Sequence, residues 1–221
     1  MKTGNRRYQI ARIGLGLSLL IMIGSAASAR DDREETLGRL KVDGKVKVNG
    51  QPASTGVILV SGSTVETAKG SSAVVSLGKL GRVEVHGGST AKIEYDVSSV
   101  STQTGQRSSA VVSLGKLGRV EVHESTNVTI TLNPSTQTAM LEAGRVRVSS
   151  SSGVVAKVGT ADGEVISLGE AEFIVDVTCG NTFVAVKSSN VEFRAGERTK
   201  QISSGGKDTA GTARAGCKVR G

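Results

Sequence analysis

The two histidines of this 221-residue chain are the side chains whose type and spacing first suggest chemistry. His86 and His123 hold equivalent places in two identical segments, each two residues after a glutamate, Glu84 or Glu121. Stacked segments would bring these four side chains together, and a zinc site takes three or four such ligands. The alternative is a solvated strand face, since the intervening valines alternate with them and take the buried side. We expect the solvated face, and no metal or other cofactor.

Four basic residues recur with the same repeat and could form a basic ladder: Lys79, Arg82, Lys116 and Arg119. Such a ladder would suit anionic glycans or phosphate. The other explanation is that charged side chains on exposed strands keep sheet edges from aggregating. Both interpretations remain open from the sequence.

The chain contains two cysteines, Cys179 and Cys217. In an oxidising compartment two thiols leave one intramolecular pairing, which would tie the C-terminal tail back to the rest of the chain. The alternative is an inert, buried Cys179 and a Cys217 that pairs between chains. We predict the intramolecular disulfide.

Residue patterns typical of an enzyme are missing from the sequence. No Gly-x-Ser-x-Gly motif is found, and carboxylates such as Glu164, Glu170, Glu172 and Asp176 are scattered rather than paired. Nucleic-acid binding is also not expected, because stacking aromatics are scarce: the whole chain has five. We predict a protein that is not an enzyme.

The elements that would position these residues are short β-strands. Val46–Val48, Val83–Val85, Val120–Val122 and Val146–Val148 each place a charged residue between two valines. Period-2 alternation indicates strands with one face on a core and the other in water. Turn signals such as Asn49-Gly50 and Asp162-Gly163 separate such segments.

A perfect internal repeat is the strongest feature of the sequence. Residues 71–86 and 108–123 both read SSAVVSLGKLGRVEVH, at an offset of 37. Each copy is interpreted as a hairpin, with a Gly-Lys-Leu-Gly connection between two strands. Tandem copies could stack as a short solenoid, or the second could be an inserted hairpin pair within one domain.

The N-terminus has the features of a secretory signal peptide. Residues 1–29 contain four of the 28 basic residues and no acid, then an apolar stretch, then Ala27-Ser28-Ala29. We predict cleavage between Ala29 and Arg30, which lowers the formal net charge from +8 to +4. The mature protein would then have no stable membrane span and would lie in the periplasm or outside the cell.

The remaining chain divides by composition into three parts. Residues 30–39 form a polar leader and residues 40–195 a single β domain. Residues 196–221 are rich in glycine and basic side chains and poor in apolar ones, so we expect a flexible tail.

Several short motifs in the β domain resemble the FecR-like domain of exported bacterial proteins. They are GKVKVNGQPA at 44–53, VILVSGSTVET at 57–67, SSAVVSLG at 71–78 and GRVEV at 81–85. The resemblance covers residues 40–195. It implies an envelope-facing β domain that meets partners, with no catalytic residues.

Together these features predict an all-β fold, a compact sandwich or roll of short antiparallel strands, with a short β-solenoid as the alternative. The expected function is that of a non-enzymatic, FecR-like envelope module acting through protein–protein interaction in signalling or assembly. The alternative is a module that binds cell-wall polysaccharide or exopolysaccharide.

Overall fold

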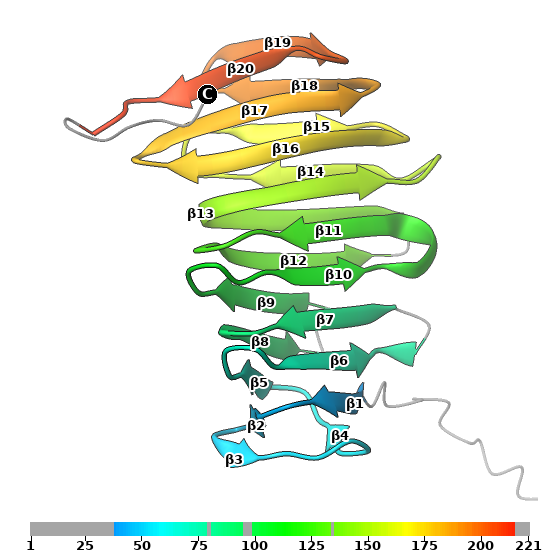
Figure 1. Cartoon of the computed structure of the whole chain (residues 1–221). Coiled ribbons are helices and arrows are strands. Elements are labelled where there is room, and N and C mark those ends of the chain that lie inside the picture. The colour runs from blue at the N-terminus through cyan, green and yellow to red at the C-terminus, as the bar shows by residue number, and fades with distance from the viewer. Residues whose placement is uncertain (1–37, 79–80, 95–98, 134, 215–221) are drawn as a thin grey trace, which may run out of the picture. The chain divides into compact units, whose positions relative to one another are not determined.

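A computed structural model describes residues 38–78, 81–94, 99–133 and 135–214. The chain divides into two units, residues 1–33 and 34–221, and all of the described residues lie in the second. Its described residues are all-β, as the alternation predicts: they form 20 strands, with the 3-10 helix η2 (Gly115–Leu117) between β10 and β11. The strands form a continuous sheet that curls into two facing parts, sheets A and B (Figure 1).

Sheet A contains ten strands or strand segments. In spatial order they are β4 (Ile58–Leu59), β1 (Gly38–Asp43), β6 (Ser72–Ser76), β7 (Arg82–His86), β10 (Ala110–Ser113), β11 (Gly118–Val122), the second part of β13 (Thr136–Ser150), β16 (Ala171–Thr178), β17 (Asn181–Ser188) and β20 (Lys207–Gly211).

Sheet B contains eleven. They are β3 (Gln51–Pro52), β2 (Val46–Val48), β5 (Ser63–Thr67), β8 (Ser89–Glu94), β9 (Ser99–Thr104), β12 (Asn127–Asn133), the first part of β13, β14 (Val155–Gly159), β15 (Glu164–Ser167), β18 (Asn190–Ala195) and β19 (Arg198–Ser203). β13 changes sheet after Ala143, and it pairs in parallel with β14; the other described pairs are antiparallel.

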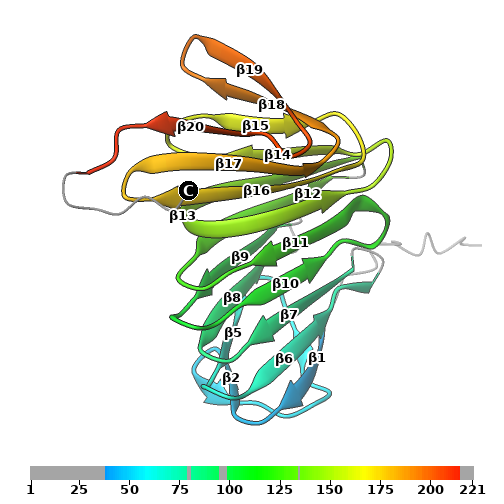
Figure 2. The same ribbon diagram turned by 45° about the horizontal axis from the view of Figure 1, so that its top comes forward.

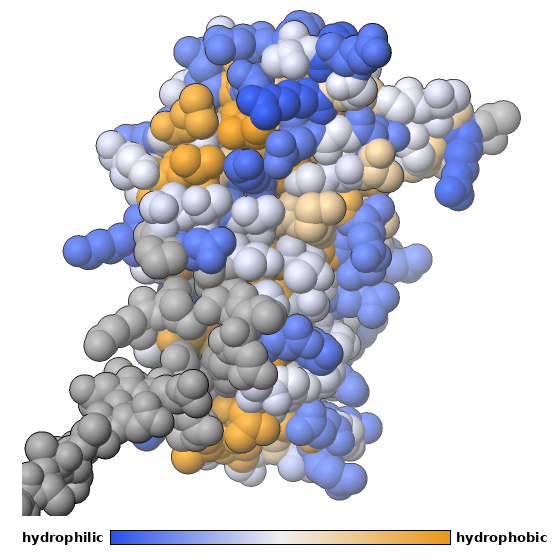
Figure 3. All heavy atoms as spheres, turned by 180° about the vertical axis from the view of Figure 1, so that it is seen from behind, coloured by the Kyte–Doolittle hydropathy of each residue, from blue (hydrophilic) through white to orange (hydrophobic). Residues whose placement is uncertain are grey.

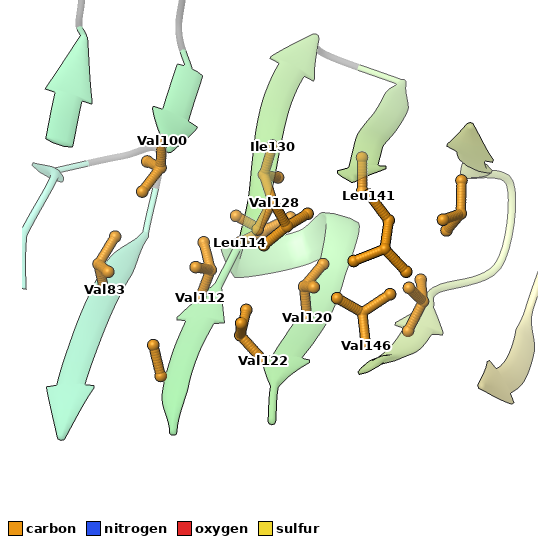
Figure 4. Packing of buried hydrophobic residues seen from close by; sticks show 14 of the residues in the cluster. Val83, Val100, Val112, Leu114, Val120, Val122, Val128, Ile130, Leu141 and Val146 are labelled. Carbon is orange, nitrogen blue, oxygen red and sulfur yellow. The ribbon is translucent and has the colours of Figure 1, made fainter. Parts of the chain in front are cut away.

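The core fills the space between the two sheets. Each strand contributes alternate residues, so Val83 and Val85 of β7 are fully buried while Arg82 and Glu84 face outward. Figure 4 shows valines of sheet A, among them Val112, Val120 and Val146, pointing toward Val128, Ile130 and Leu141 of sheet B. The one-faced alternation in the sequence therefore reflects a single, shared interior.

The two identical segments form hairpins, as predicted, and they lie side by side in sheet A. Ala73 pairs with Val85 in the first hairpin, and Ala110 pairs with Val122 in the second. β7 of the first pairs with β10 of the second, with Val83 opposite Val112.

The structural repeat is longer than the identical sequence. β5 and β9 lie at equivalent places 37 residues apart, and so do β8 and β12. A buried threonine marks each unit: Thr67 Oγ1 donates to the His86 carbonyl at 2.6 Å, and Thr104 Oγ1 donates to the His123 carbonyl. Each hydroxyl also accepts from a backbone N–H of the next strand, Ser89 at 3.2 Å or Thr126 at 2.8 Å. Buried polar groups that are satisfied in this way fix the register where the chain crosses between sheets.

The prediction of a flexible tail from Gly196 is wrong for residues 198–211. These residues form β19 and β20, which extend sheets B and A at the C-terminal end (Figure 2). Amino-acid composition does not predict these strands, because an edge strand buries few side chains of its own. In β19 the buried side chain is that of Ile202. Pairing with β17 and β18 supplies the order that the tail's own apolar content does not.

Candidate interaction surfaces

The outer face of sheet A carries two of the four predicted basic residues, Arg82 and Arg119, in a row that crosses the strands. Arg82 and Arg119 both lie opposite Ser113, on either side of β10. Each forms an ion pair with the glutamate two residues later, Arg82–Glu84 at 2.7 Å and Arg119–Glu121 at 3.3 Å. The sequence repeat therefore produces a row of balanced charges at these positions, and not a ladder of free cations. Lys116 is exposed on η2, and Lys79 lies outside the described residues.

The two histidines do not meet. His86 ends β7 and His123 follows β11, so β10 lies between them and separates the strands by about 10 Å. The described residues hold no group of three His, Cys, Asp or Glu side chains placed to bind a metal ion.

His123 departs from the expectation of a solvated face, because its Nε2 is buried and has no hydrogen-bond partner. Burial, together with the positive charge of Arg145, lowers the pKa of His123 from its ordinary value of 6.5. The two identical segments thus place their histidines in different environments. The backbone N–H of His123 donates to the Arg145 carbonyl, whereas that of His86 donates to the Ser109 carbonyl.

A polar pocket of about 420 Å³ lies beside His123 on this face. Arg145 Nε donates to Asp176 Oδ2 at 2.7 Å, and the hydroxyl of Thr178 donates to the other carboxylate oxygen. The side chain of Asp176 is 3% exposed, so this ion pair is largely removed from water. Sequence patterns do not reveal this group, because Arg145 lies on β13 and both Asp176 and Thr178 lie on β16, two strands that the turn positions alone do not align.

Cys179 borders the same pocket, at the tip of the β16–β17 hairpin. Its backbone is left-handed, with φ of 63°, and Gly180 follows with φ of 73°, as a two-residue hairpin turn requires. Cys217, like Ala29 and Arg30, lies outside the described residues. The predicted bridge from Cys179 to Cys217 remains a prediction.

The two ends of the curled sheet differ in chemistry. At the C-terminal end Asp208 of β20 points inward and meets two cations of β19, Arg198 at 3.2 Å and Lys200 at 3.5 Å. This ion-pair group joins the last strand of sheet A to the last strand of sheet B. Inward charges at an edge discourage further strand pairing.

At the N-terminal end no comparable group of charges covers the core in the described part of the chain. The segment from β3 to β4 crosses from sheet B to sheet A and leaves Ile58 56% exposed and Val60 58% exposed. Figure 3 shows hydrophobic residues at this end of the molecule, and others in its upper half. Larger apolar exposure on an otherwise polar surface marks interaction sites.

A groove of about 570 Å³ opens at the same end. Apolar groups of Val46, Pro52, Ala53 and Ala68 line it together with Lys45, Lys47 and Glu66. We call this groove, together with the exposed Ile58 and Val60 at the same end, the N-terminal end surface; its members are Lys45, Val46, Lys47, Pro52, Ala53, Ile58, Val60, Glu66 and Ala68.

No helix in the described ranges is long and apolar enough to cross a membrane. Comparison with protein-family models gives no match to this chain. Comparison with curated proteins gives none either.

Two crystal structures of a candidate anti-sigma factor from Parabacteroides distasonis are similar to parts of the chain. The first has a TM-score of 0.46 and 15% identity and aligns over 54% of this chain and 57% of that one. The second has a TM-score of 0.43 and 15% identity, over 52% and 56%. The chain thus matches little more than half of the length of these proteins, and similarity at this level carries no argument about function.

Proposed function

We propose that this protein is an exported, non-enzymatic module of the cell envelope that acts through protein–protein contact, as its FecR-like motifs suggest. The observation that carries the proposal is the difference between the two ends. Ion pairs close the C-terminal end, whereas the N-terminal end leaves two large apolar side chains and an apolar groove in solvent. Stacked β architectures need polar end caps for solubility, so an end whose described residues leave apolar side chains in solvent is the natural place for a partner.

The test is partner capture by the full chain in its native envelope. The double variant Ile58→Asp/Val60→Asp should lose the partner that the wild-type chain retains. Met140→Asp/Leu168→Asp is the control, because these two residues are also large, apolar and exposed, at 53% and 80%, but lie away from the N-terminal end, Met140 in β13 and Leu168 just after β15. Equal capture by both variants would contradict the proposal.

The alternative is polysaccharide binding, and the polar pocket beside His123 favours it. The pocket offers a guanidinium, a carboxylate and hydroxyls, which suit the hydroxyl groups of a sugar. Sedimentation with isolated peptidoglycan and exopolysaccharide separates the two functions. A protein-binding module stays in the supernatant, and a saccharide-binding module sediments in a way that Arg145→Ala abolishes.

Export is a separate part of the proposal and has its own measurement. The mass of the protein recovered from the envelope fraction should correspond to a chain that begins at Arg30. A mass that still includes Met22 would contradict cleavage and favour an anchored form.

A further inference from the structure

Basic residues without ion-pair partners gather at the N-terminal end. Along the middle of sheet A the arginines are neutralised, for example Arg147 by Glu172 and Arg145 by Asp176. Over residues 38–71, within the described part of the chain, no carboxylate lies within ion-pair distance of any basic side chain. These cations are Arg39, Lys41, Lys45, Lys47 and Lys69, against two carboxylates, Asp43 and Glu66.

Two of these cations stand at the groove. Lys45 and Lys47 line it on either side of the buried Val46, with apolar groups of Pro52 and Ala53 nearby. Glu66 lies opposite Lys47 in the strand register, and the two side chains form no ion pair in the structure as described. The groove therefore offers apolar contact beside positive charge.

Hydrogen bonds from the backbone of a partner to the strands at the N-terminal end would contribute little to binding. β3 is two residues long, and its second residue is Pro52, which has no N–H to donate to an added strand. The backbone of β1 is already occupied: Leu40 N donates to the Val57 carbonyl, and Val42 N donates to the Thr55 hydroxyl. Recognition at the N-terminal end surface must come mainly from side chains.

The charges disfavour a second copy of this chain as the binding partner at the N-terminal end surface. Head-to-tail stacking would place this basic end against the C-terminal end, where Lys187 and Lys207 are exposed. Like charges brought together across an interface disfavour association.

We propose that the N-terminal end surface docks an extended acidic segment of a different protein, one that carries carboxylates between apolar side chains. The inference rests on the proposed function and names the chemistry of the partner. Apolar side chains of the segment enter the groove, and its carboxylates pair with Lys45 and Lys47.

The probe is a short peptide of alternating Glu and Val or Leu, titrated into the full chain and followed by amide chemical shifts. A peptide with Lys in place of Glu is the matched control. The Glu peptide should shift the amides of Lys45, Lys47 and Ala53, more weakly as salt is added. Lys45→Glu/Lys47→Glu should weaken binding about five-fold or more, and Lys187→Glu/Lys207→Glu at the opposite end should leave it unchanged.

Equal binding of the Glu and Lys peptides at this end would overturn the acidic partner and leave a protein-binding surface in place. Binding of neither peptide at this end would overturn the inference and remove the surface on which the proposed function rests. Amide shifts at both ends of the sheet that grow with protein concentration, without peptide, would show that copies of the chain stack on one another. This result would also overturn the inference.

Discussion

His86 and His123 each end an identical 16-residue segment, but they are followed by Gly87 and Glu124 and have different neighbours in the fold. Since burial and Arg145 lower the pKa of His123, the unfolded chain takes up a proton before the folded one as the pH falls. The free energy of unfolding should therefore decrease below pH 6.5, and level off once the folded protein is protonated too.

Replacing the side chain of His123 tests this predicted pH dependence directly. His123→Gln should reduce the loss of stability between about pH 7 and pH 5, measured by denaturant unfolding at each pH. His86→Gln is the control, and it should keep the wild-type pH dependence. A flat wild-type profile, or the same change in both variants, would contradict the role of the buried imidazole.

Gly118 is a residue at which the backbone leaves no room for a side chain. Its φ is +129°, and a Cβ would lie 2.0 Å from the Ser149 carbonyl oxygen in the neighbouring strand. Gly118→Ala should cost about 3 kcal/mol or more, since strain and a backbone clash act together. Gly70→Ala has only the strain of a positive φ, because nothing lies within 4 Å of its Cβ. Equal losses of unfolding free energy in the Gly118→Ala and Gly70→Ala variants would contradict the predicted clash.

At the scale of elements, the 37-residue repeat shows which strands the sequence predicts and which it does not. The hairpins of 71–86 and 108–123 followed from alternation and turn glycines, and the structure has both. The equivalence of β5 with β9 has little sequence identity to reveal it: at the offset of 37 the buried Thr67 and Thr104 match, and the rest depends on in–out alternation. The N-terminal groove was also missed, because it forms between strands whose pairing no local pattern specifies.

The 37-residue unit is predicted to be removable. Deleting residues 71–107 joins Gly70 to Ser108, so that β5 takes the place of β9 and β10 takes the place of β6, with every buried face retained. The shortened protein should keep its β-type circular dichroism and unfold cooperatively. Deleting 71–86 alone removes one hairpin from sheet A and none from sheet B, and should abolish folding. Loss of the β signal in the first deletion would show that both units are required.

The C-terminal strands bring the tail within reach of the β16–β17 turn. Arg214 N donates to the Cys179 carbonyl at 2.9 Å, three residues before Cys217. We predict a Cys179–Cys217 disulfide, whose 38-residue loop would contribute at most about 4 kcal/mol. Non-reducing mass spectrometry should find no alkylatable thiol in the monomer. Two free thiols would contradict the bridge, and a disulfide-linked dimer would replace it with the intermolecular alternative.

At the scale of the whole molecule, the two ends of the curled sheet differ: ion pairs close one end, and the described residues of the other end are apolar and basic. The middle of sheet A balances its charges strand by strand, which suits a supporting surface better than a binding one. The protein's interactions should therefore concentrate at the N-terminal end surface.

Site-specific photo-crosslinking in living cells tests this claim most directly. A photoreactive residue at position 58 should give a discrete adduct with a second protein, and the yield should fall when Lys45 and Lys47 are changed to Glu. The same residue at position 168, which replaces a Leu that is 80% exposed just after β15, should give none. An adduct from position 168 and none from position 58 would contradict the account.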